Sequence, residues 1–340
     1  MSKKIHPLSA VRLGPRAHPA PAWPQLEQQF APTCYVRVPD CPLLDNGDAA
    51  VTGRRMNWEI GPGWVVAWKA NVFAREALTF GGAQLWQPSD VAASFYHVRL
   101  DVNGHDQAFT DSESPTWTRL GLMHAMDQGW LPWIVRVQPG DVWSWDHWFS
   151  GLQTVDRVRA EIALQYVSDE DMAAQVGGSL PEPDGAIMLA RTLPRRYMTP
   201  PEPVAVLGPG IESAARRVDF QNGPGQLVAW CGEARYEYTY SQTVYDGAGL
   251  GAAGSCEIQA SWHDGEHLVQ NGSGPDWLSF YTLWGGRGGR RWQPLCRKFS
   301  SGDQLTVRMR NINTDSPGIE IEPEVIFAWT GDRDLDGRAR

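Results

Sequence analysis

The sequence has little that marks a membrane-bound, secreted or nucleic-acid-binding protein. No apolar run approaches the length needed to cross a bilayer. The formal net charge is −9 and the isoelectric point about 5.4, so positive charge is too scarce for a general nucleic-acid-binding surface. The first residues, MSKKIHPLSAVRLG, contain lysines but no apolar core, so they do not match a secretory leader. We expect synthesis in a cytoplasm, no membrane span and no direct nucleic-acid contact.

Catalytic and metal-binding motifs are also missing. The chain has no HExxH motif, no GxSxG nucleophile elbow and no glycine-rich phosphate loop before a helix. His263 and His267 lie in HDGEH, where a turn dipeptide removes helical geometry. We therefore predict no catalytic residue, no cofactor and no enzymatic activity. For metal, the sequence offers only a partial calcium loop, DRDLDG, whose twelfth position would lie beyond Arg340; its acidic residues are Asp332, Asp334 and Asp336.

Cysteine is scarce, and its odd number of five does not suggest a disulfide framework. Three cysteines, Cys231, Cys256 and Cys296, align mostly with apolar residues elsewhere in the chain, which indicates small buried hydrophobes. Cys34 and Cys41 lie in a proline-rich segment, and no second pair completes a zinc set.

The most informative feature that is present is an internal repeat. Residues 54–68 read RRMNWEIGPGWVVAW and residues 216–230 read RRVDFQNGPGQLVAW, with eight of fifteen positions identical. The correspondence continues at a nearly constant offset through EIALQY at 161 and EVIFAW at 324. Such self-similarity over more than a hundred residues indicates a duplicated domain. The sequence therefore predicts two copies of one unit, residues 54–171 and 216–334.

The repeated unit has the pattern of β-structure. VWSWDHWF at 142–149 and QLTVRMRN at 304–311 alternate apolar with polar residues, and turn dipeptides separate such runs. Helical patterns are confined to 168–176 and 211–217. The predicted fold is all-β, with two tandem, internally duplicated β-sandwich or jelly-roll domains. The predicted organisation is an extended proline-rich N-terminal arm (1–32), domain 1 (33–171), a Pro/Gly-rich linker (172–203), domain 2 (204–334) and a C-terminal tail (335–340).

Tryptophan is abundant, with seventeen residues. Trp64, Trp143 and Trp145 have no tryptophan counterpart in the second unit, where Gln226, Leu305 and Val307 align with them. Alternation along 64–72 places Trp64 on the same strand face as Trp68. Surplus aromatics on one domain can belong to a core, to a protein interface or to a sugar-stacking face. We take Trp64, Trp143 and Trp145 as interface candidates, with glycan contact as an alternative.

Two arginine pairs recur at equivalent positions, Arg54 with Arg55 and Arg216 with Arg217. They either pair with acids across a domain or subunit boundary or lie solvated at a strand edge. We include all four as interface candidates.

Tandem β-sandwiches, proline-rich arms, no leader and abundant tryptophan together resemble virion structural proteins of bacteriophages, including tandem jelly-roll coat proteins. The resemblance implies a non-enzymatic capsid, decoration or tail-associated subunit that binds copies of itself and other virion proteins. It implies location in the virion after synthesis in the host cytoplasm, and it assigns no functional residue. Two alternatives stay open: a carbohydrate-binding double β-sandwich protein, and a double jelly-roll enzyme of the peptide N-glycanase type.

Overall fold

A computed structural model describes the greater part of the chain. The described residues are 30–39, 44–45, 51–77, 84–103, 105–107, 118–120, 130–150, 157–176, 196–198, 206–220, 224–240, 243–248, 250–284, 293–313 and 319–331. The predicted arm before residue 30, Cys41 and the calcium candidates Asp332, Asp334 and Asp336 lie outside these residues.

The N-terminal half contains two sheets, which together form sandwich 1. Sheet A has the order β17-β1-β11-β4-β5, with β2 also paired to β11 and β9 to β4. Its strands are β1 (Cys34–Arg37), β2 (Leu44–Asp45), β4 (Gly63–Ala77), β5 (Gln84–Pro88), β9 (Leu131–Val137), β11 (Arg157–Ser168) and, from the other half, β17 (Val269–Gln270). Sheet B has the order β3-β10-β6-β7, with β8 paired to β6. Its strands are β3 (Val51–Asn57), β6 (Tyr96–Val102), β7 (His105–Gln107), β8 (Thr118–Arg119) and β10 (Val142–Phe149).

The C-terminal half forms sandwich 2 from sheets C and D. Sheet C has the order β12-β21-β14-β15, with β19 paired to β14, and sheet D has the order β13-β20-β16-β18. The strands of sheet C are β12 (Arg196–Met198), β14 (Gly225–Tyr240), β15 (Thr243–Ala248), β19 (Gln293–Phe299) and β21 (Ile319–Gly331). Those of sheet D are β13 (Arg216–Asp219), β16 (Cys256–Trp262), β18 (Leu278–Ser279) and β20 (Gln304–Asn311). The predicted all-β sandwich architecture is confirmed.

Four short helices accompany the described strands: α2 (Asp90–Phe95), α4 (Asp169–Val176), α6 (Leu250–Ser255) and α7 (Phe280–Trp284). The helix predicted at 168–176 is confirmed as α4, whose first turn is acidic. The helix predicted at 211–217 is wrong. There the chain runs extended into β13, whose edge pairing with β20 overrides the helical preference of the alanines.

Strand pairing follows the same order in both sandwiches. Trp68 in β4 lies opposite Leu131 of β9 and Leu164 of β11. Trp230 in β14 lies opposite the residues of β19 and β21 that the sequence repeat aligns with these two, Gln293 and Phe327. The two tryptophans therefore occupy corresponding strands in corresponding register. Duplication of the whole unit stays a prediction that this correspondence supports.

A β-bulge corrects one detail of the sequence analysis. The register of β4 against β9 shifts between Val65 and Ala67. Trp64 and Val66 therefore pack in a small cluster with Val167 and Met172, while the side chain of Trp68 lies in the core of sandwich 1. The prediction that Trp64 and Trp68 share one face is wrong, because a bulge adds a residue and reverses the alternation.

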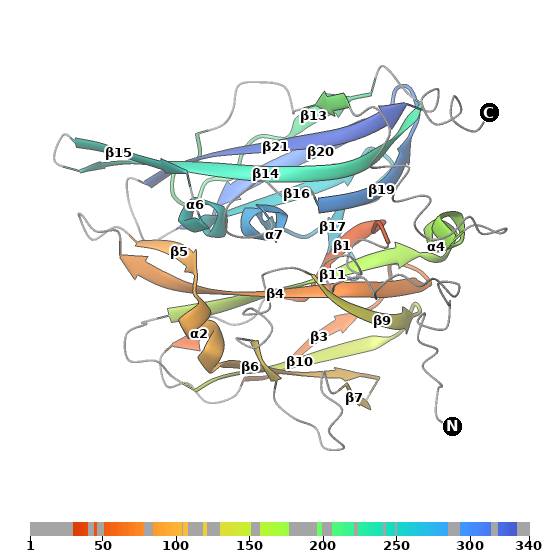
Figure 1. Cartoon of the computed structure of the whole chain (residues 1–340), viewed down its shortest axis with the longest axis horizontal. Helices are drawn as coiled ribbons and strands as arrows, with labels where there is room; N and C mark the ends of the chain where they lie inside the picture. Colours follow the sequence, from red (N-terminus) through yellow and green to blue (C-terminus); the bar gives the residue numbers. More distant parts are fainter. Residues whose placement is uncertain are drawn as a thin grey trace, which may run out of the picture.

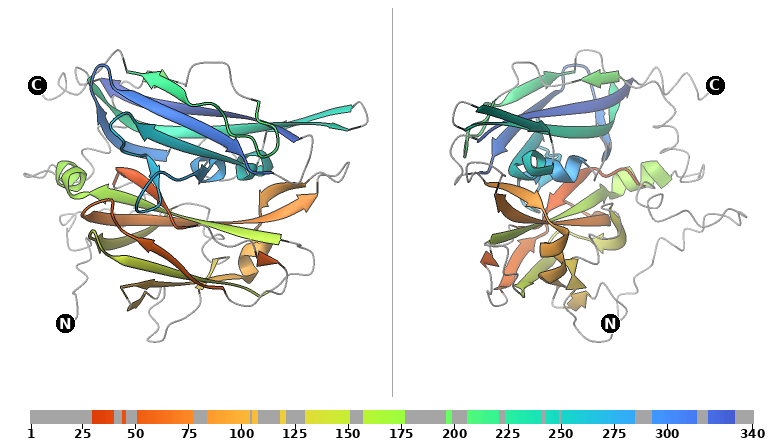
Figure 2. Two further views of the ribbon diagram at one scale, coloured as in Figure 1. Left: turned by 180° about the vertical axis from the view of Figure 1, so that it is seen from behind. Right: turned by 60° about the vertical axis from the view of Figure 1, so that its left-hand side comes forward.

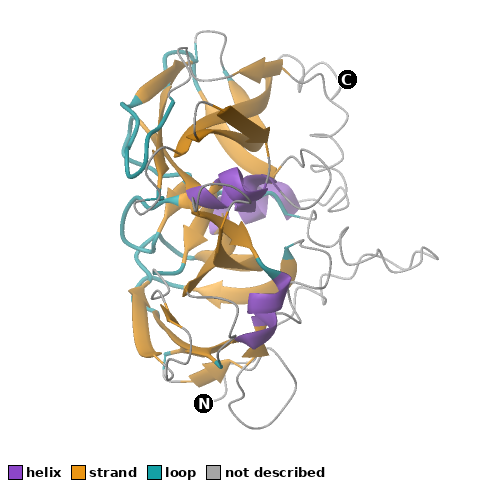
Figure 3. Ribbon diagram, turned by 90° about the vertical axis from the view of Figure 1, so that its left-hand side faces the viewer, coloured by secondary structure: helices purple, strands orange, loops and turns teal. Residues whose placement is uncertain are grey.

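The two sandwiches stack directly on one another. In Figure 1, sheet B lies lowest, sheet A above it, then α6 and α7, and then the strands of sandwich 2. The views in Figure 2 keep this order, and Figure 3 shows helices in the middle of the molecule between the upper and lower strands. The core of sandwich 2 is continuous with residues of sheet A, including Tyr35, Ala67 and Phe73. The outward face of sheet A therefore closes the core of sandwich 2.

Candidate functional site

The boundary between the sandwiches, called the junction below, is the largest concentration of buried polar chemistry in the described chain. Strand β1 runs through it, antiparallel to β11 of sandwich 1 and parallel to β17 of sandwich 2. The Tyr35 amide donates to the Leu268 carbonyl at 2.8 Å, and the Cys296 amide donates to the Pro32 carbonyl at 3.1 Å. Residues 32–37 thus share backbone hydrogen bonds with both sandwiches.

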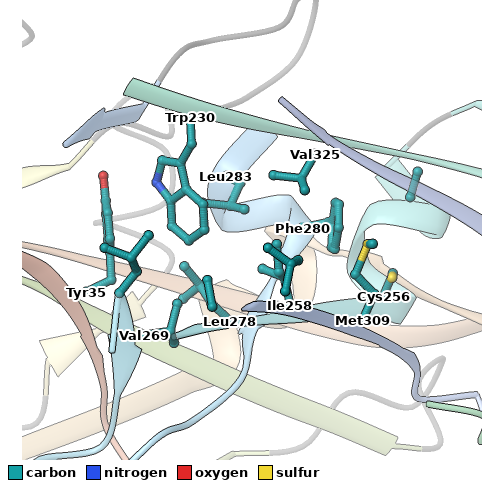
Figure 4. Packing of buried hydrophobic residues seen from close by; sticks show 14 of the residues in the cluster. Tyr35, Trp230, Cys256, Ile258, Val269, Leu278, Phe280, Leu283, Met309 and Val325 are labelled. Carbon is teal, nitrogen blue, oxygen red and sulfur yellow. The ribbon is translucent and has the colours of Figure 1, made fainter. Parts of the chain in front are cut away.

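Aromatic rings fill one end of the junction. The ring of Tyr35 lies between Trp130 of sandwich 1 and Trp230 of sandwich 2, with centroid distances of 5.4 and 5.6 Å. Figure 4 shows Tyr35 and Trp230 side by side above Val269. The Tyr35 hydroxyl donates to the Pro294 carbonyl at 2.7 Å, and Trp130 Nε1 donates to Gln293 Oε1 at 2.9 Å. Burial raises the pKa of Tyr35 well above its ordinary value, so the hydroxyl stays a donor.

A buried ionic network holds the centre of the junction. Glu257 of β16 contacts three arginines: Arg159 Nη1 at 3.1 Å and Arg37 Nη2 at 3.4 Å from Oε1, and Arg310 Nη2 at 2.6 Å from Oε2. Arg37 and Arg159 come from sandwich 1, so two of these contacts cross the junction. Burial alone would raise the pKa of Glu257, but the three guanidinium groups outweigh it and lower the pKa to about 2. The carboxylate is therefore ionised throughout the neutral range.

A second carboxylate, Glu161 of β11 in sandwich 1, binds residues of sandwich 2 across the junction. Its oxygens accept hydrogen bonds from the Ser279 amide at 2.9 Å, the Ser279 hydroxyl at 2.8 Å and the Thr282 hydroxyl. Arg37 Nε lies 3.8 Å from the same carboxylate. Asn71 Nδ2 donates to Thr282 Oγ1 at 2.7 Å, which extends the network to β4.

The charged and polar groups of the network bond to one another across the junction. Every carboxylate oxygen of Glu161 and Glu257 already accepts from donors of the chain itself. Both side chains are buried, at 1% exposure. Removing one charged partner from a buried network of this kind lowers the free energy of unfolding by about 3–5 kcal/mol, because the other charge is left unpaired away from water. The junction therefore joins the two sandwiches through buried charges as well as apolar contacts.

The base of the N-terminal arm is also fixed in place. The backbone amide of Ala31 donates to Gln175 Oε1 of α4 at 2.7 Å, and Gln175 Nε2 donates to the Ala31 carbonyl at 2.8 Å. Thr33 donates its hydroxyl to Asp171 and accepts from the Ser168 amide at 2.9 Å. Ala31 and Thr33 are therefore fixed beside α4.

Two of the predicted interface tryptophans belong to the core. Trp143 and Trp145 are fully buried and face inward from β10. Trp143 stacks on Trp58 with centroids 5.7 Å apart. Their proposed place at an interface is wrong, because strand alternation turns both rings into sandwich 1. Trp64 is half-buried, and Arg136 lies over its ring at 5.2 Å.

The recurring arginines lie on edge strands of the two sandwiches. Arg54 and Arg55 are on β3 at the edge of sheet B, and Arg216 and Arg217 are on β13 at the edge of sheet D. Arg54, Arg55 and Arg217 are exposed, whereas partial burial lowers the pKa of Arg216. Among the described residues, the ion pairs across the junction are made by Arg37 and Arg159 and by none of these four arginines. Charged residues on an edge strand also discourage unwanted strand pairing.

The remaining sequence predictions divide between those the structure describes and those it does not. The predicted burial of Cys231, Cys256 and Cys296 is confirmed, and Cys34 is buried too. Within the described residues, no three His, Cys, Asp or Glu side chains gather where they could hold a metal ion. No helix in the same part of the chain is long and apolar enough to cross a membrane.

Sequence reasoning missed the junction network because its strand has an ordinary alternating pattern. In RVRAEIALQYVS the face of Arg157, Arg159, Glu161 and Gln165 is polar, as on a solvated strand, whereas the structure buries both faces. Arg159 and Glu161 lie two apart and therefore share one face. Charges on a strand with two buried faces must find partners inside the protein. The partners themselves lie far away in sequence and could not be assigned.

No protein-family model matches the sequence, and no curated protein matches it. Among solved structures, a CUB1-EGF-CUB2 fragment of human MASP-1/3 aligns over 87% of this chain and 98% of its own, at 9% identity and a TM-score of 0.18. The VP2 subviral particle of infectious bursal disease virus aligns over 88% of this chain and 75% of its own, at 11% identity and a TM-score of 0.20. Latent PorU of Porphyromonas gingivalis aligns over 80% of this chain but 25% of its own, at 11% identity and a TM-score of 0.18. These scores establish no common fold with the chain.

Proposed function

We propose that the protein is a non-enzymatic structural subunit that acts through self-association. The observation that carries the proposal is the junction. Two sandwiches are joined by a buried charge network in which every carboxylate oxygen is bonded within the chain. A building block needs a fixed shape, whereas an enzyme with a site between domains needs open polar groups there.

The finer proposal is that the subunit belongs to a bacteriophage virion, as coat, decoration or tail-associated protein. It is supported by tandem sandwiches in one chain, which give pseudo-symmetry suited to a shell or tube. The fixed start of the arm beside α4 supports it as well. From that point, residues 1–29 can extend onto a neighbouring subunit. The partners are then copies of this chain and other virion proteins.

Sedimentation velocity and cryo-electron microscopy of the purified full-length chain test the proposal. We expect discrete assemblies whose size grows with concentration. A chain that stays monomeric up to high concentration would overturn the proposal. Elemental analysis that found stoichiometric zinc or copper, together with hydrolytic turnover, would replace it with an enzymatic function.

A glycan array separates the carbohydrate-binding alternative. That alternative relied on surplus tryptophans, and two of the three are buried in the core. Strong binding of an oligosaccharide by a monomeric chain would favour it over self-association.

A further inference from the structure

Gln165 is a buried amide at the aromatic end of the junction. It lies on β11 opposite Tyr35 of β1 and Ala67 of β4, and all three side chains are buried. Residues directly opposite one another in neighbouring strands share one face of the sheet. Tyr35 and Ala67 belong to the core of sandwich 2, so Gln165 points toward that sandwich as well. A full amide, with donor and acceptor, is thus placed in a mostly apolar contact between the sandwiches.

The amide of Gln165 has no hydrogen-bond partner among the described residues. Both Oε1 and Nε2 are shielded from solvent, and the side chain is 0% exposed. Burial of an amide without hydrogen bonds is costly, and nearly all buried polar groups bond either to the protein or to ordered water. The strand itself does not require an amide here, because the sequence repeat aligns Gln165 with Ala328.

A second buried polar group faces the same place from sandwich 2. Nε1 of Trp230 is shielded from solvent and has no hydrogen-bond partner within the described chain. Figure 4 shows this indole nitrogen on the side of the ring that faces the Tyr35 hydroxyl, and the two ring centroids are 5.6 Å apart. The nearby Trp130 differs, because its Nε1 donates to Gln293 Oε1 at 2.9 Å. An unmet donor is therefore not a general feature of the tryptophans at this end of the junction.

The Tyr35 hydroxyl lies between these two groups. It donates to the Pro294 carbonyl at 2.7 Å, so its oxygen is still able to accept a hydrogen bond. Burial raises the pKa of Tyr35, whereas Trp230 and Gln165 act in the opposite direction as hydrogen-bonding neighbours. Both groups are therefore close to the hydroxyl, although neither completes a direct hydrogen bond with it. Polar atoms from β1, β11 and β14 thus converge on one point.

Small side chains leave space beside Gln165. Its neighbours on the same face of sheet A include Ala67 on β4 and Ala163 two residues earlier on β11. Neither methyl group is long enough to cover the amide. A buried water needs roughly 10–15 Å³ of accessible space and two to four polar partners. The donor of Trp230, the oxygen of Tyr35 and the Gln165 amide supply these partners.

We infer that an ordered water molecule is bound at this point and joins Gln165 of sandwich 1 to Trp230 of sandwich 2. This junction water accepts a hydrogen bond from Trp230 Nε1 and donates to Gln165 Oε1 and to Tyr35 Oη. Gln165 Nε2 donates to a second water beside the first. Water-mediated hydrogen bonds are nearly as favourable as direct ones, so the polar connection between the sandwiches extends from the ionic network to the aromatic end. The inference concerns contacts within one chain and does not depend on self-association.

A crystal structure of the full-length chain, at a resolution that shows ordered water, tests the site directly. We expect a density peak of one oxygen atom at about 2.7–3.2 Å from both Trp230 Nε1 and Gln165 Oε1. Nε1 of Trp130, which donates to Gln293, is the internal control and should have no such peak. A Gln165 amide that bonds directly to Tyr35 or Trp230, with no peak between them, would show that the inference is wrong.

Gln165→Met tests the contribution of the site to stability, because methionine keeps the length of the side chain and removes both polar atoms. We expect the melting temperature to fall by about 2 °C or more, since the junction water loses a partner and Trp230 Nε1 is less well satisfied. The exposed Gln138→Met is the matched control and should melt like the wild type. An unchanged or higher melting temperature for Gln165→Met would mean that the amide has no partner in the folded protein, contrary to the inference. Sedimentation velocity should be the same for both variants as for the wild type, so this test is separate from that of the proposed function.

Discussion

Arg159 Nη1 lies 3.1 Å from Glu257 Oε1, and this contact joins the last strand of sandwich 1 to the first long strand of sheet D. Both side chains are buried. Arg159 also donates to the Gly254 carbonyl at 2.6 Å and lies over the ring of Phe73 at 4.5 Å. The guanidinium is thus held by three kinds of contact that cross the junction or border it.

Replacing Glu257 with glutamine should destabilise the whole protein. Glutamine leaves Arg37, Arg159 and Arg310 without their shared carboxylate, and we expect a loss of about 3–5 kcal/mol in the free energy of unfolding. Urea unfolding followed by tryptophan fluorescence measures it. The exposed Glu59→Gln is the matched control and should change stability by less than about 0.5 kcal/mol. Equal stability of the two variants would show that the network is not needed to hold the sandwiches together.

The same carboxylate predicts a dependence of stability on pH. The folded-state pKa of Glu257 is lowered to about 2, below its ordinary value of 4.5. Its contribution is therefore fully present above pH 4.5 and is lost as the pH falls from 4.5 toward 2. Melting temperatures across this window should fall more steeply for the wild type than for Glu257→Gln. Parallel curves would assign the acid transition to other groups.

His147 should add a second and separate pH dependence. Burial lowers its pKa from 6.5 to about 4, although Asp146 acts in the opposite direction. The unfolded chain therefore binds the proton more readily between these values, so stability is highest above pH 6.5 and falls as the pH drops toward 4. Tyr96 Oη lies 3.2 Å from His147 Nδ1. His147→Gln should flatten the melting curve in this window, and a slope unchanged from the wild type would contradict the assignment.

The tryptophans of sandwich 1 should separate by role. Trp145→Ala removes a fully buried ring and should cost about 3–5 kcal/mol of unfolding free energy. Trp64→Ala removes a half-buried ring outside the main core and should cost clearly less. Chemical denaturation of both variants measures the difference. A similar small loss for both would mean that the core closes around the space left by Trp145.

The sequence predicted the class of fold because alternation and the internal repeat are local signals. Eight identities around GPG located corresponding strands, and Trp68 and Trp230 do lie in the same register. Local patterns could not reveal the bulge after Val65. In a regular strand Trp64 and Trp68 would share a face, and the bulge places them on different faces. In VWSWDHWF the alternation of Trp143 and Trp145 with Ser144 and Asp146 does favour burial of the two rings, and the interface prediction set this local signal aside.

The junction was beyond sequence reasoning for a different reason. Its pairs join residues such as Arg37 and Glu257, whose proximity depends on how two finished sandwiches stack. Stacking is a tertiary outcome that no spacing in the chain encodes. The charges of RVRAEIALQYVS all lie on one face, which in sequence reads as a solvated face, so neither their burial nor their partners could be predicted.

Two nested deletions should separate the arm from the strand that follows it. Removing residues 1–29 keeps Ala31 and Thr33, which bind α4, and keeps β1. We expect this chain to melt like the full-length protein but to assemble less well, because it lacks the segment that we propose to contact a neighbouring subunit. Removing residues 1–38 also takes away Tyr35 and Arg37, so the junction loses its shared strand, its central ring and one arginine of the network. That chain should melt at a clearly lower temperature, with tryptophan fluorescence reporting water entry beside Trp230. If the shorter deletion assembles as well as the full chain, the arm has no part in assembly. If the longer deletion melts unchanged, β1 does not hold the two sandwiches together.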